Sequence, residues 1–272
     1  TMSTQKKFII TASNKGGVGK SMTASLLVDA YKKAGSKAAF YDADGTIGAL
    51  YRMFKNDVTA YNARDEKEIR NLLNSLKNND SDVVLHDMPG GAMSSVLQHI
   101  NGDSSDESAD TFVETVERAG YQLVILHVLS FDYGSVRSVN NVMKSFGISA
   151  KKDDVDGTLS VAKEKWAENV QHVACVNLFA SEHEEDFPYW FTTSNNVREV
   201  FLASGGIEFK LPRLRPGVVA QVQFEGQNWH DATNAKTTKL DLNDETVVVK
   251  FLKRFRSALV DTSADKALGL TK

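Results

Sequence analysis

A glycine-rich loop between a short apolar run and an amphipathic segment constrains this chain more than any other feature. Phe8-Ile9-Ile10 predicts a buried strand, and residues 20–34 carry apolar side chains at helical spacing. Between them runs Ser13-Asn14-Lys15-Gly16-Gly17-Val18-Gly19-Lys20-Ser21. Such a loop turns backbone N–H groups and a helix N-terminus toward one point, where an anion is stabilised. The sequence therefore predicts a phosphate-binding loop.

The residues of this loop suit a nucleoside triphosphate with a bound metal ion. The glycines allow close backbone approach, Lys20 supplies a positive charge, and the Ser21 hydroxyl is placed to bind Mg²⁺. ATP and Mg²⁺ are the expected cofactors. We expect the nucleotide to be held by Gly16, Gly17, Val18, Gly19, Lys20, Ser21 and Met22.

Strand and helix patterns alternate along the rest of the chain, which predicts a doubly wound α/β fold with a mostly parallel sheet and helices on both faces. Two nearly continuous apolar runs, Leu123–Leu129 and Val173–Leu178, predict strands in the sheet centre. Ile207–Leu211 alternates with polar residues and predicts a strand near the edge. Shorter strands are expected at Ala38–Tyr41 and Val83–Leu85, and helices at Glu66–Leu76, Tyr133–Phe146, Leu159–Val170, Val197–Ala203 and Thr246–Leu259.

Residues 1–272 are expected to form a single domain, because α/β domains can run to about 250 residues or more as single units. Two segments interrupt the alternation and are interpreted as surface insertions. The first lies near 102–117 and carries six acidic residues, and the second lies near 151–157.

Acidic residues follow two of the predicted strands. Asp42 and Asp44 end the second strand, and Asp87 ends the third, just before Gly90 and Gly91. The carboxyl ends of parallel strands meet at one edge of the sheet, where ligands bind. We expect these carboxylates to lie beside the phosphate loop, and the glycines to give the following segment conformational freedom.

The run KGGVGKS resembles the deviant Walker A motif of the ParA/MinD family of dimeric ATPases. The resemblance implies ATP hydrolysis by a homodimer that closes around two ATP molecules, with Lys15 reaching the phosphates of the partner. It also implies that a partner protein stimulates slow turnover. Asn14 stands where the usual motif has its first glycine.

The same resemblance assigns roles outside the loop. Asp44 would orient the attacking water, Asp42 would support the magnesium shell, and Asp87 would be the Walker B acid. Asn177 and Pro212 would lie beside the adenine. Family members often continue the second strand with Pro-Gln-Gly, whereas this chain has Gly45-Thr46-Ile47.

The balance of acidic and basic residues limits how the protein could bind DNA. With 32 basic and 35 acidic residues the net charge is −3, so nonspecific DNA binding needs a local patch. The candidate patch comprises Lys210, Arg213, Arg215, Arg254 and Arg256.

The resemblance to this family implies a role in DNA partition, plasmid maintenance or conjugation, in which such a patch would contact the DNA backbone. The first alternative is a MinD-like membrane-cycling ATPase, because residues 251–255 resemble the amphipathic anchor of MinD. An apolar helical stripe more often packs onto a sheet, which makes a membrane the weaker prediction. A metabolic synthetase of the same superfamily is a further alternative, which Lys15 disfavours.

Cysteine content and hydropathy point to the cytoplasm. Cys175 is the single cysteine, which excludes an intramolecular disulfide and a zinc ribbon. No stretch approaches the roughly 18 apolar residues of a membrane span. The histidines show no metal-ligand spacing.

Overall fold

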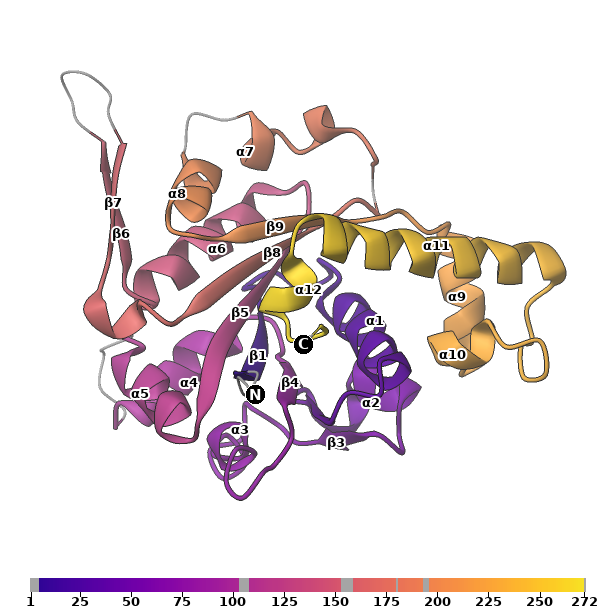
Figure 1. The fold of residues 1–272 in the computed structure, drawn as a ribbon, viewed down its shortest axis with the longest axis horizontal. Coiled ribbons are helices and arrows are strands. Elements are labelled where there is room, and N and C mark those ends of the chain that lie inside the picture. The colour runs from indigo at the N-terminus through magenta and orange to yellow at the C-terminus, as the bar shows by residue number, and fades with distance from the viewer. Residues whose placement is uncertain (1–4, 103–107, 153–158, 180, 193–195, 272) are drawn as a thin grey trace.

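The computed structural model describes residues 5–102, 108–152, 159–179, 181–192 and 196–271 (Figure 1). Within these ranges, the core is a seven-stranded sheet in the order β3-β2-β4-β1-β5-β8-β9, and every neighbouring pair is parallel. The doubly wound parallel sheet predicted from the sequence is confirmed. Its strands are β1 (Lys6–Ala12), β2 (Ala38–Asp42), β3 (Val58–Ala60), β4 (Val83–Asp87), β5 (Tyr121–Leu129), β8 (Gln171–Asn177) and β9 (Ile207–Leu211).

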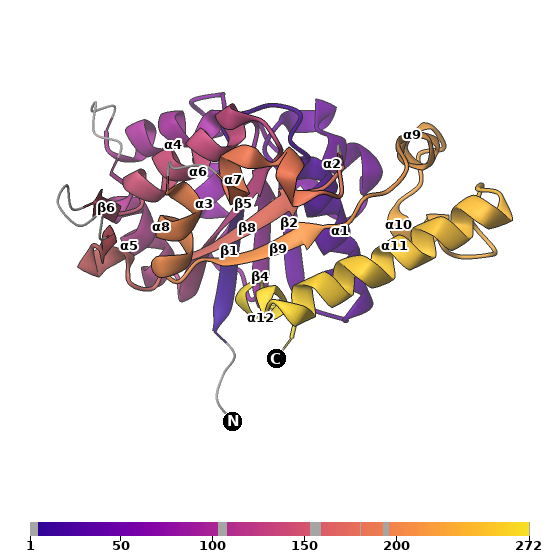
Figure 2. The ribbon, with the colours of Figure 1, turned by 90° about the horizontal axis from the view of Figure 1, so that it is seen from above.

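Helices cover both faces of this sheet (Figures 1 and 2). One face carries α1 (Lys20–Lys33), α11 (Leu242–Asp261) and α12 (Ala264–Ala267), with α2 (Ala49–Met53), α9 (Pro216–Phe224) and α10 (Trp229–Ala232) beside them. The other face carries α3 (Asn71–Asn74), α4 (Ala92–Ile100), α5 (Asp110–Arg118), α6 (Tyr133–Ser145), α7 (Pro188–Phe191) and α8 (Val197–Ala203). Among the helices of the described residues, none combines the length and apolar composition that crossing a membrane requires.

Alternation along β1 explains why both faces are covered. Phe8 and Ile10 pack into one cluster with α4 and α5, while Ile9 packs into the other with α1. Successive side chains of a strand point to opposite faces, and all three of these are fully buried. A strand with two buried faces must lie inside the sheet, and β1 does, between β4 and β5. The carboxyl end of β1 therefore lies near the middle of the sheet edge at which all seven parallel strands end.

The predicted helix at Leu159–Val170 is wrong. The structure has β7 (Leu159–Lys163), which pairs antiparallel with β6 (Ile148–Lys152), followed by a short 3₁₀ turn at Lys165–Ala167. Exposure along β7 alternates with a period of two, which fits a strand and not a helix. The predicted helix at Glu66–Leu76 is likewise reduced to α3, with turns around it.

The interpretation of 102–117 as a surface insertion is also corrected. Residues 103–107 lie outside the described residues, but from Asp110 onward the chain forms α5. Phe112 and Val116 of α5 are completely buried under the sheet, while Glu114 and Glu117 face solvent. Glu114 and Glu117 thus belong to the outer face of an amphipathic core helix. Of the second predicted insertion, residues 153–157 lie outside the described residues and 151–152 end β6.

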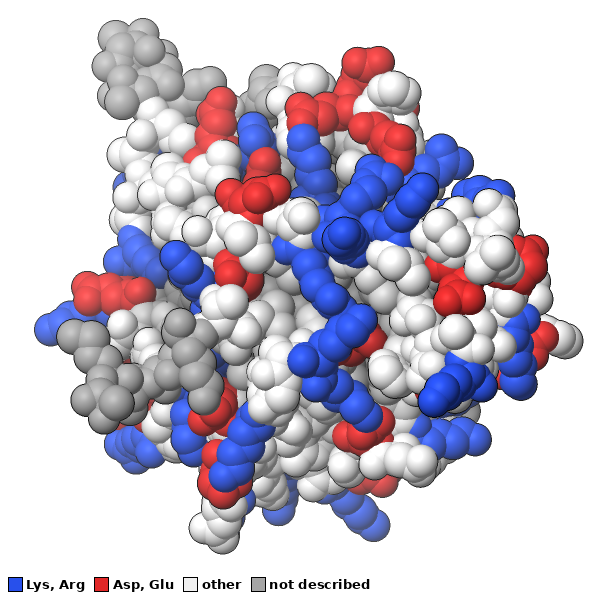
Figure 3. Space-filling view, turned by 45° about the vertical axis from the view of Figure 1, so that its right-hand side comes forward, with Lys and Arg blue, Asp and Glu red and all other residues white. Residues whose placement is uncertain are grey.

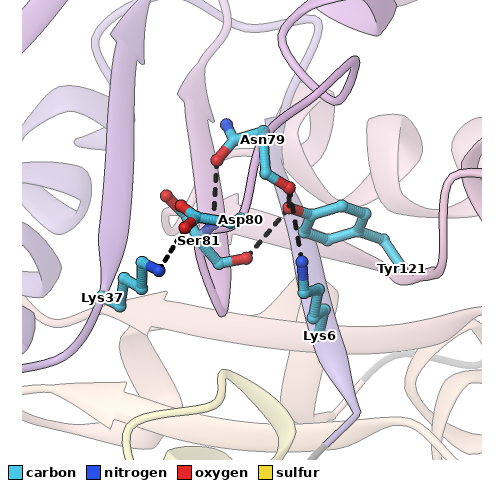
Figure 4. A network of polar contacts seen from close by, with 6 residues as sticks. All are labelled: Lys6, Lys37, Asn79, Asp80, Ser81 and Tyr121. Carbon is cyan, nitrogen blue, oxygen red and sulfur yellow. Dashed lines mark hydrogen bonds and ion pairs between the residues drawn. The ribbon is translucent and has the colours of Figure 1, made fainter.

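A polar network fixes the amino ends of three strands (Figure 4). The Tyr121 hydroxyl at the start of β5 lies 3.1 Å from the carbonyl oxygen of Asn79 and 2.9 Å from that of Ser81, which precede β4. Lys6 of β1 donates to the same Asn79 carbonyl over 3.3 Å. The sheet is therefore clamped at the end opposite the phosphate-binding loop.

Candidate functional site

The glycine-rich loop follows β1 and ends at the first residue of α1. Its conformation depends on glycine at two positions, because Gly17 (φ +75°) and Gly19 (φ +101°) lie in the left-handed region. A Cβ on Gly19 would also lie 2.4 Å from Nδ2 of Asn177. A side chain at this position would therefore be strained and would clash with Asn177, whereas glycine lets the end of β8 lie against the loop.

Lys20 lies at the base of the loop with only 9% of its surface exposed. Its Nζ donates to the backbone carbonyl of Lys15 over 3.3 Å. Burial lowers the pKa of this ammonium, while the nearby charges of Asp87 and Asp44 raise it. The structure thus brings the loop lysine and two of the predicted acids together.

Asp87, at the end of β4, is the most deeply embedded acid of the site. Its Oδ1 accepts a hydrogen bond from Thr11 Oγ1 at 3.0 Å, and the Ser21 hydroxyl lies close enough to the carboxylate to lower its pKa. Thr11 Oγ1 in turn accepts from the backbone N–H of Met88 at 2.8 Å. Burial raises the pKa of Asp87 to about 7.

The pairing of Ser21 with Asp87 fits a magnesium ion. Mg²⁺ takes oxygen ligands, commonly one or two side chains with waters and phosphate oxygens. A divalent cation at this place would also supply the charge that a buried carboxylate lacks. Ser21 and Asp87 are thus the residues that the geometry supports for the metal.

Asp42 has a structural task that the sequence did not suggest. Its carboxylate accepts hydrogen bonds from the backbone N–H groups of Asp44 at 3.0 Å and Tyr51 at 2.9 Å. A Cβ on Gly48 would lie 2.1 Å from its Oδ2. Asp42 therefore holds the segment between β2 and α2 and satisfies the N-terminus of α2. Its predicted place in the magnesium shell stays a prediction.

Asp44 lies at the surface of the site and pairs with Arg64, a residue that sequence reasoning missed. Arg64 Nη1 lies 2.6 Å from Asp44 Oδ1. The pairing arises because β3 runs parallel to β2, so both strands end at the same edge of the sheet. The segments that follow them are joined there by a bridge between Asp44 and Asn62. No motif marks Arg64, and only the strand pairing reveals it.

Lys15 is exposed, and its side chain extends toward the first turn of α6. The Lys15 Cδ lies 3.8 Å from where a Cβ on Gly134 would be. Next to that glycine, Tyr133 is 52% exposed and its ring contacts Tyr189. Lys15 thus lies on an accessible face of the loop. A lysine that contacts a nucleotide bound to another subunit would need such exposure.

Asn177 and Pro212 occupy different surroundings. Asn177 Nδ2 donates to the Val18 carbonyl at 2.8 Å, and its Oδ1 accepts from the backbone N–H of Phe179 at 3.1 Å. Pro212 is buried and lines a groove against α11. Asn177 is therefore a support for the loop, and the adenine role of both residues stays a prediction.

A cavity of about 480 Å³ opens beside the start of α1, within the size range of small-molecule sites. It lies where α1, α2 and α9 meet, and no sequence motif predicted it. The lining residues include Ser21, Met22, Ala49, Met53, Gln223 and Phe224.

The predicted basic patch is divided. Lys210 and Arg254 line one groove of about 590 Å³ together with Lys250 and Lys253. Arg256 lies on another side of α11, 3.4 Å from Asp29 of α1. Figure 3 shows lysine and arginine side chains running in a band across this side of the molecule, with acidic side chains near it.

Several members of this patch are paired with carboxylates. Lys210 pairs with Glu184, and Arg254 lies 3.7 Å from Glu182. Arg215 Nη2 lies 2.6 Å from Asp244 Oδ1. Arg213 is exposed next to the groove. Of the predicted patch, Lys210 and Arg254 therefore lie together in one groove, and Lys250 and Lys253 add to its positive charge.

The segment that resembles a membrane anchor belongs to the core. Phe251, Leu252 and Phe255 are at most 4% exposed. Phe255 contacts the ring of Phe209 in β9, and Phe251 contacts that of Trp229 in α10. This apolar stripe packs onto the sheet, so α11 offers no free anchor in the folded chain.

Other metal and thiol chemistry finds no support in the described part of the chain. There, no three His, Cys, Asp or Glu side chains form a group that could hold a metal ion. Cys175 is buried, and burial raises its pKa to about 12. The thiol is therefore protonated and inert near neutral pH.

The parallel sheet, the loop after β1 and the lysine and serine at the start of α1 together define a P-loop nucleotide-binding protein. The model of the CobQ/CobB/MinD/ParA nucleotide binding domain matches residues 9–146, and the chain belongs to this family. No curated protein sequence matches the chain.

Solved structures with a similar fold include two cell-division proteins. MinD from Aquifex aeolicus is 14% identical, with 92% of this chain and 97% of that chain covered and a TM-score of 0.48. MinD from Pyrococcus horikoshii, in complex with Mg-ADP, is 15% identical, with 92% and 95% covered and a TM-score of 0.48. The Cyanothece McdA(D38A)-ATP complex is 12% identical, with 92% and 98% covered and a TM-score of 0.41.

Proposed function

We propose that this protein is a Mg²⁺-dependent ATPase that acts as an ATP-driven dimerisation switch. The observation that carries the proposal is the meeting of Lys20, Ser21 and Asp87 at the start of α1. The lysine would neutralise phosphate charge, while the serine and aspartate would hold the metal. Phosphoryl transfer depends mainly on such positioning and charge neutralisation.

Hydrolysis further requires a group that orients water. Asp44 lies at the mouth of the site, near enough for its charge to raise the pKa of Lys20. A carboxylate there would accept a hydrogen bond from the attacking water. Ser21 and Asp87 would hold the Mg²⁺, which when bound would supply positive charge against the charge that develops on the phosphate.

Dimerisation is proposed from Lys15. This lysine is exposed on the outer side of the loop, whereas Lys20 already serves the inner side. A cation in this position would act on the ATP of a facing subunit, as an arginine finger does. ATP would then favour the closed dimer because it contacts both subunits there, and hydrolysis would release them.

The proposed role is the positioning of DNA in partition, plasmid maintenance or conjugation, with a partner protein that stimulates turnover. The support is the groove beside α11, in which Lys210, Lys250, Lys253 and Arg254 converge. A weak basic groove gains strength when two copies are joined in a dimer, which would make DNA binding depend on ATP.

Phosphate release and oligomeric state test the ATPase and the dimer. We expect Mg²⁺-dependent release that Lys20→Ala abolishes, and an ATP-dependent dimer in size-exclusion chromatography that Lys15→Ala prevents. Lys77→Ala, which removes an exposed lysine elsewhere, is the matched control. A protein that stays monomeric with ATP, with hydrolysis unchanged in Lys15→Ala, would contradict the switch.

Two binding measurements test whether the protein binds DNA or a membrane. The first uses a DNA duplex across a salt series, and the second uses anionic liposomes. We expect ATP-dependent DNA binding that Lys250→Glu/Lys253→Glu weakens and that Lys77→Glu/Lys236→Glu, with the same charge change, leaves intact. Loss of two phosphate contacts should reduce the slope of log K against log salt by about 2. Liposome binding without DNA binding would favour the membrane-cycling alternative.

A further inference from the structure

Arg64 lies at the mouth of the candidate site, on a segment that carries no motif. Its Nη1 donates to Oδ1 of Asp44 over 2.6 Å. The charges of Arg64 and Asp44 also act on Lys20 in opposite directions, since the first lowers the pKa of that ammonium and the second raises it. The guanidinium is therefore close to both the candidate water-orienting acid and the loop lysine.

The backbone around Arg64 is fixed to the segment that follows β2. The Ala63 N–H donates to the Ala43 carbonyl at 2.8 Å, and the Gly45 N–H donates to the Tyr61 carbonyl at 2.9 Å. Ala63 is fully buried, and Tyr61 is 4% exposed. Beyond the parallel strands β2 and β3, an antiparallel bridge between Asp44 and Asn62 thus joins the two following segments and sets Arg64 beside Asp44.

The turn that presents Arg64 is closed by its own side chains. Asn62 Oδ1 accepts from the Arg64 N–H at 3.0 Å, and the Asn62 N–H donates to Glu68 Oε2 at 2.5 Å. The guanidinium itself reaches solvent, since the Arg64 side chain is 56% exposed and that of Asp44 is 41% exposed. A rigid backbone therefore carries a charged group whose contact to Asp44 lies at the surface.

We propose that Arg64 is a positioning residue for hydrolysis, which holds the Asp44 carboxylate in the orientation that accepts a hydrogen bond from the attacking water. This role presupposes the ATPase activity proposed above. One oxygen of Asp44 is engaged by the guanidinium, which limits the rotation of the carboxylate and directs the second oxygen. Small losses of alignment at a reacting group reduce rate strongly while substrate binding is retained.

Because the ion pair of Arg64 and Asp44 is exposed, an effect of Arg64 on catalysis can be distinguished from an effect on folding stability. Exposed ion pairs contribute only about 0–1 kcal/mol to folding, so removal of Arg64 should leave the protein folded. A merely structural Arg64 would then leave both kcat and KM unchanged. A positioning Arg64 would change kcat while the affinity for ATP stays the same.

The test compares Arg64→Ala, Arg64→Lys, Asp44→Asn and the double variant Arg64→Ala/Asp44→Asn in phosphate release and in binding of a fluorescent ATP analogue. Loss of a supporting group of this kind typically costs about 10- to 100-fold in activity, and we expect Arg64→Ala to lose at least tenfold in kcat. Lysine should restore part of the rate, because it keeps the charge but not the fork geometry. The double variant should be no slower than Asp44→Asn alone.

Arg118→Ala is the matched control, because Arg118 forms an exposed ion pair of the same 2.6 Å with Glu114 on α5. Its kcat should equal that of the wild type. Wild-type kcat in Arg64→Ala, or full additivity with Asp44→Asn, would overturn the proposal while the ATPase stands. Weaker ATP binding with unchanged kcat would also overturn it, since Arg64 would then be a ligand for the nucleotide. Failure of the wild type to hydrolyse ATP would instead reject the proposed function and this role with it.

Discussion

The Asn177 side chain at the end of β8 donates from Nδ2 to the carbonyl of Val18, over 2.8 Å. This bond joins a strand on one side of the sheet to the loop that follows β1, although 159 residues separate the two in sequence. It is possible because Gly19, the next residue, has no side chain to occupy the space. The conformation of the loop therefore depends on the hydrogen bond from Asn177 as well as on its own glycines.

Gly19→Ala should abolish nucleotide binding and lower the melting temperature. The new Cβ would lie 2.4 Å from Asn177 Nδ2, at a φ of +101° that non-glycine residues rarely adopt. Strain of this kind costs on the order of 1–3 kcal/mol before the clash is added. Isothermal titration with ATP and thermal denaturation would measure the two effects.

Gly217→Ala in α9 is the control for Gly19→Ala, because a Cβ there meets nothing within 4 Å. It should be neutral or stabilise the helix by up to about 1 kcal/mol. Gly19→Ala/Asn177→Ala should recover part of the stability that Gly19→Ala loses. A double variant as unstable as the single one would show that φ strain alone, without the clash, accounts for the loss.

Ser21→Ala should remove the effect of Mg²⁺ on nucleotide affinity and leave the metal-free affinity nearly unchanged. The Ser21 hydroxyl lies close enough to the Asp87 carboxylate to lower its pKa, which places both groups where the metal would bind. Titrations of ADP with Mg²⁺ and with EDTA would show the difference. Ser257→Ala, an exposed serine of α11, should behave as the wild type. An unchanged Mg²⁺ effect in Ser21→Ala would exclude this hydroxyl as a metal ligand.

The central strands and the phosphate loop were predictable because each depends on a local pattern. Buried strands such as β5 are apolar on both faces, and the loop is confined to one run of residues. Asp42 shows the limit of such reasoning. Its position predicted a place in the magnesium shell, which stays a prediction. The hydrogen bonds that its carboxylate accepts from the backbone of Asp44 and Tyr51 could not be predicted, because they depend on how the following segment folds back.

The features that could not be predicted depend on contacts between distant segments. The pair of Arg64 and Asp44 follows from the pairing of β3 with β2. The packing of the apolar stripe of α11 onto the sheet was the stronger prediction and is confirmed, but its ring contacts with Phe209 and Trp229 could not be predicted. Residues 159–163 carry a two-residue alternation too short to separate strand from helix, and pairing with β6 decides between them.

Stability should fall as the pH is lowered from about 6.5 toward 3, because buried histidines must take up protons to unfold. Burial lowers the pKa of His86 and of His127 to about 3 and also lowers that of His172. Each of these three histidines binds a proton in the unfolded chain but not in the folded chain over this range. Asp87, whose pKa is raised to about 7, acts in the opposite direction as one group against three, so the free energy of unfolding still rises with pH from 5 to 7. Each such group contributes at most about 1.4 kcal/mol per pH unit.

Urea denaturation at several pH values between 7 and 5 would measure this slope. His183→Gln, at an exposed position, should leave the slope unchanged. His127→Phe should reduce it, because one of the groups that must be protonated on unfolding is then absent. A free energy of unfolding that stays constant from pH 7 to 5 would show that these side chains are accessible to protons in the folded protein.

Phe251→Asp should unfold the protein, because the Phe251 side chain is 3% exposed in the contact between α11 and the sheet. An unpaired carboxylate at this place should cost about 4 kcal/mol or more, a large part of the stability of most domains. Val249→Asp, on the same helix but 44% exposed, should change the stability by no more than about 0.5 kcal/mol. Urea denaturation would measure both variants. If Phe251→Asp instead kept the wild-type stability and lost only liposome binding, α11 would have to leave the sheet to act as a membrane anchor.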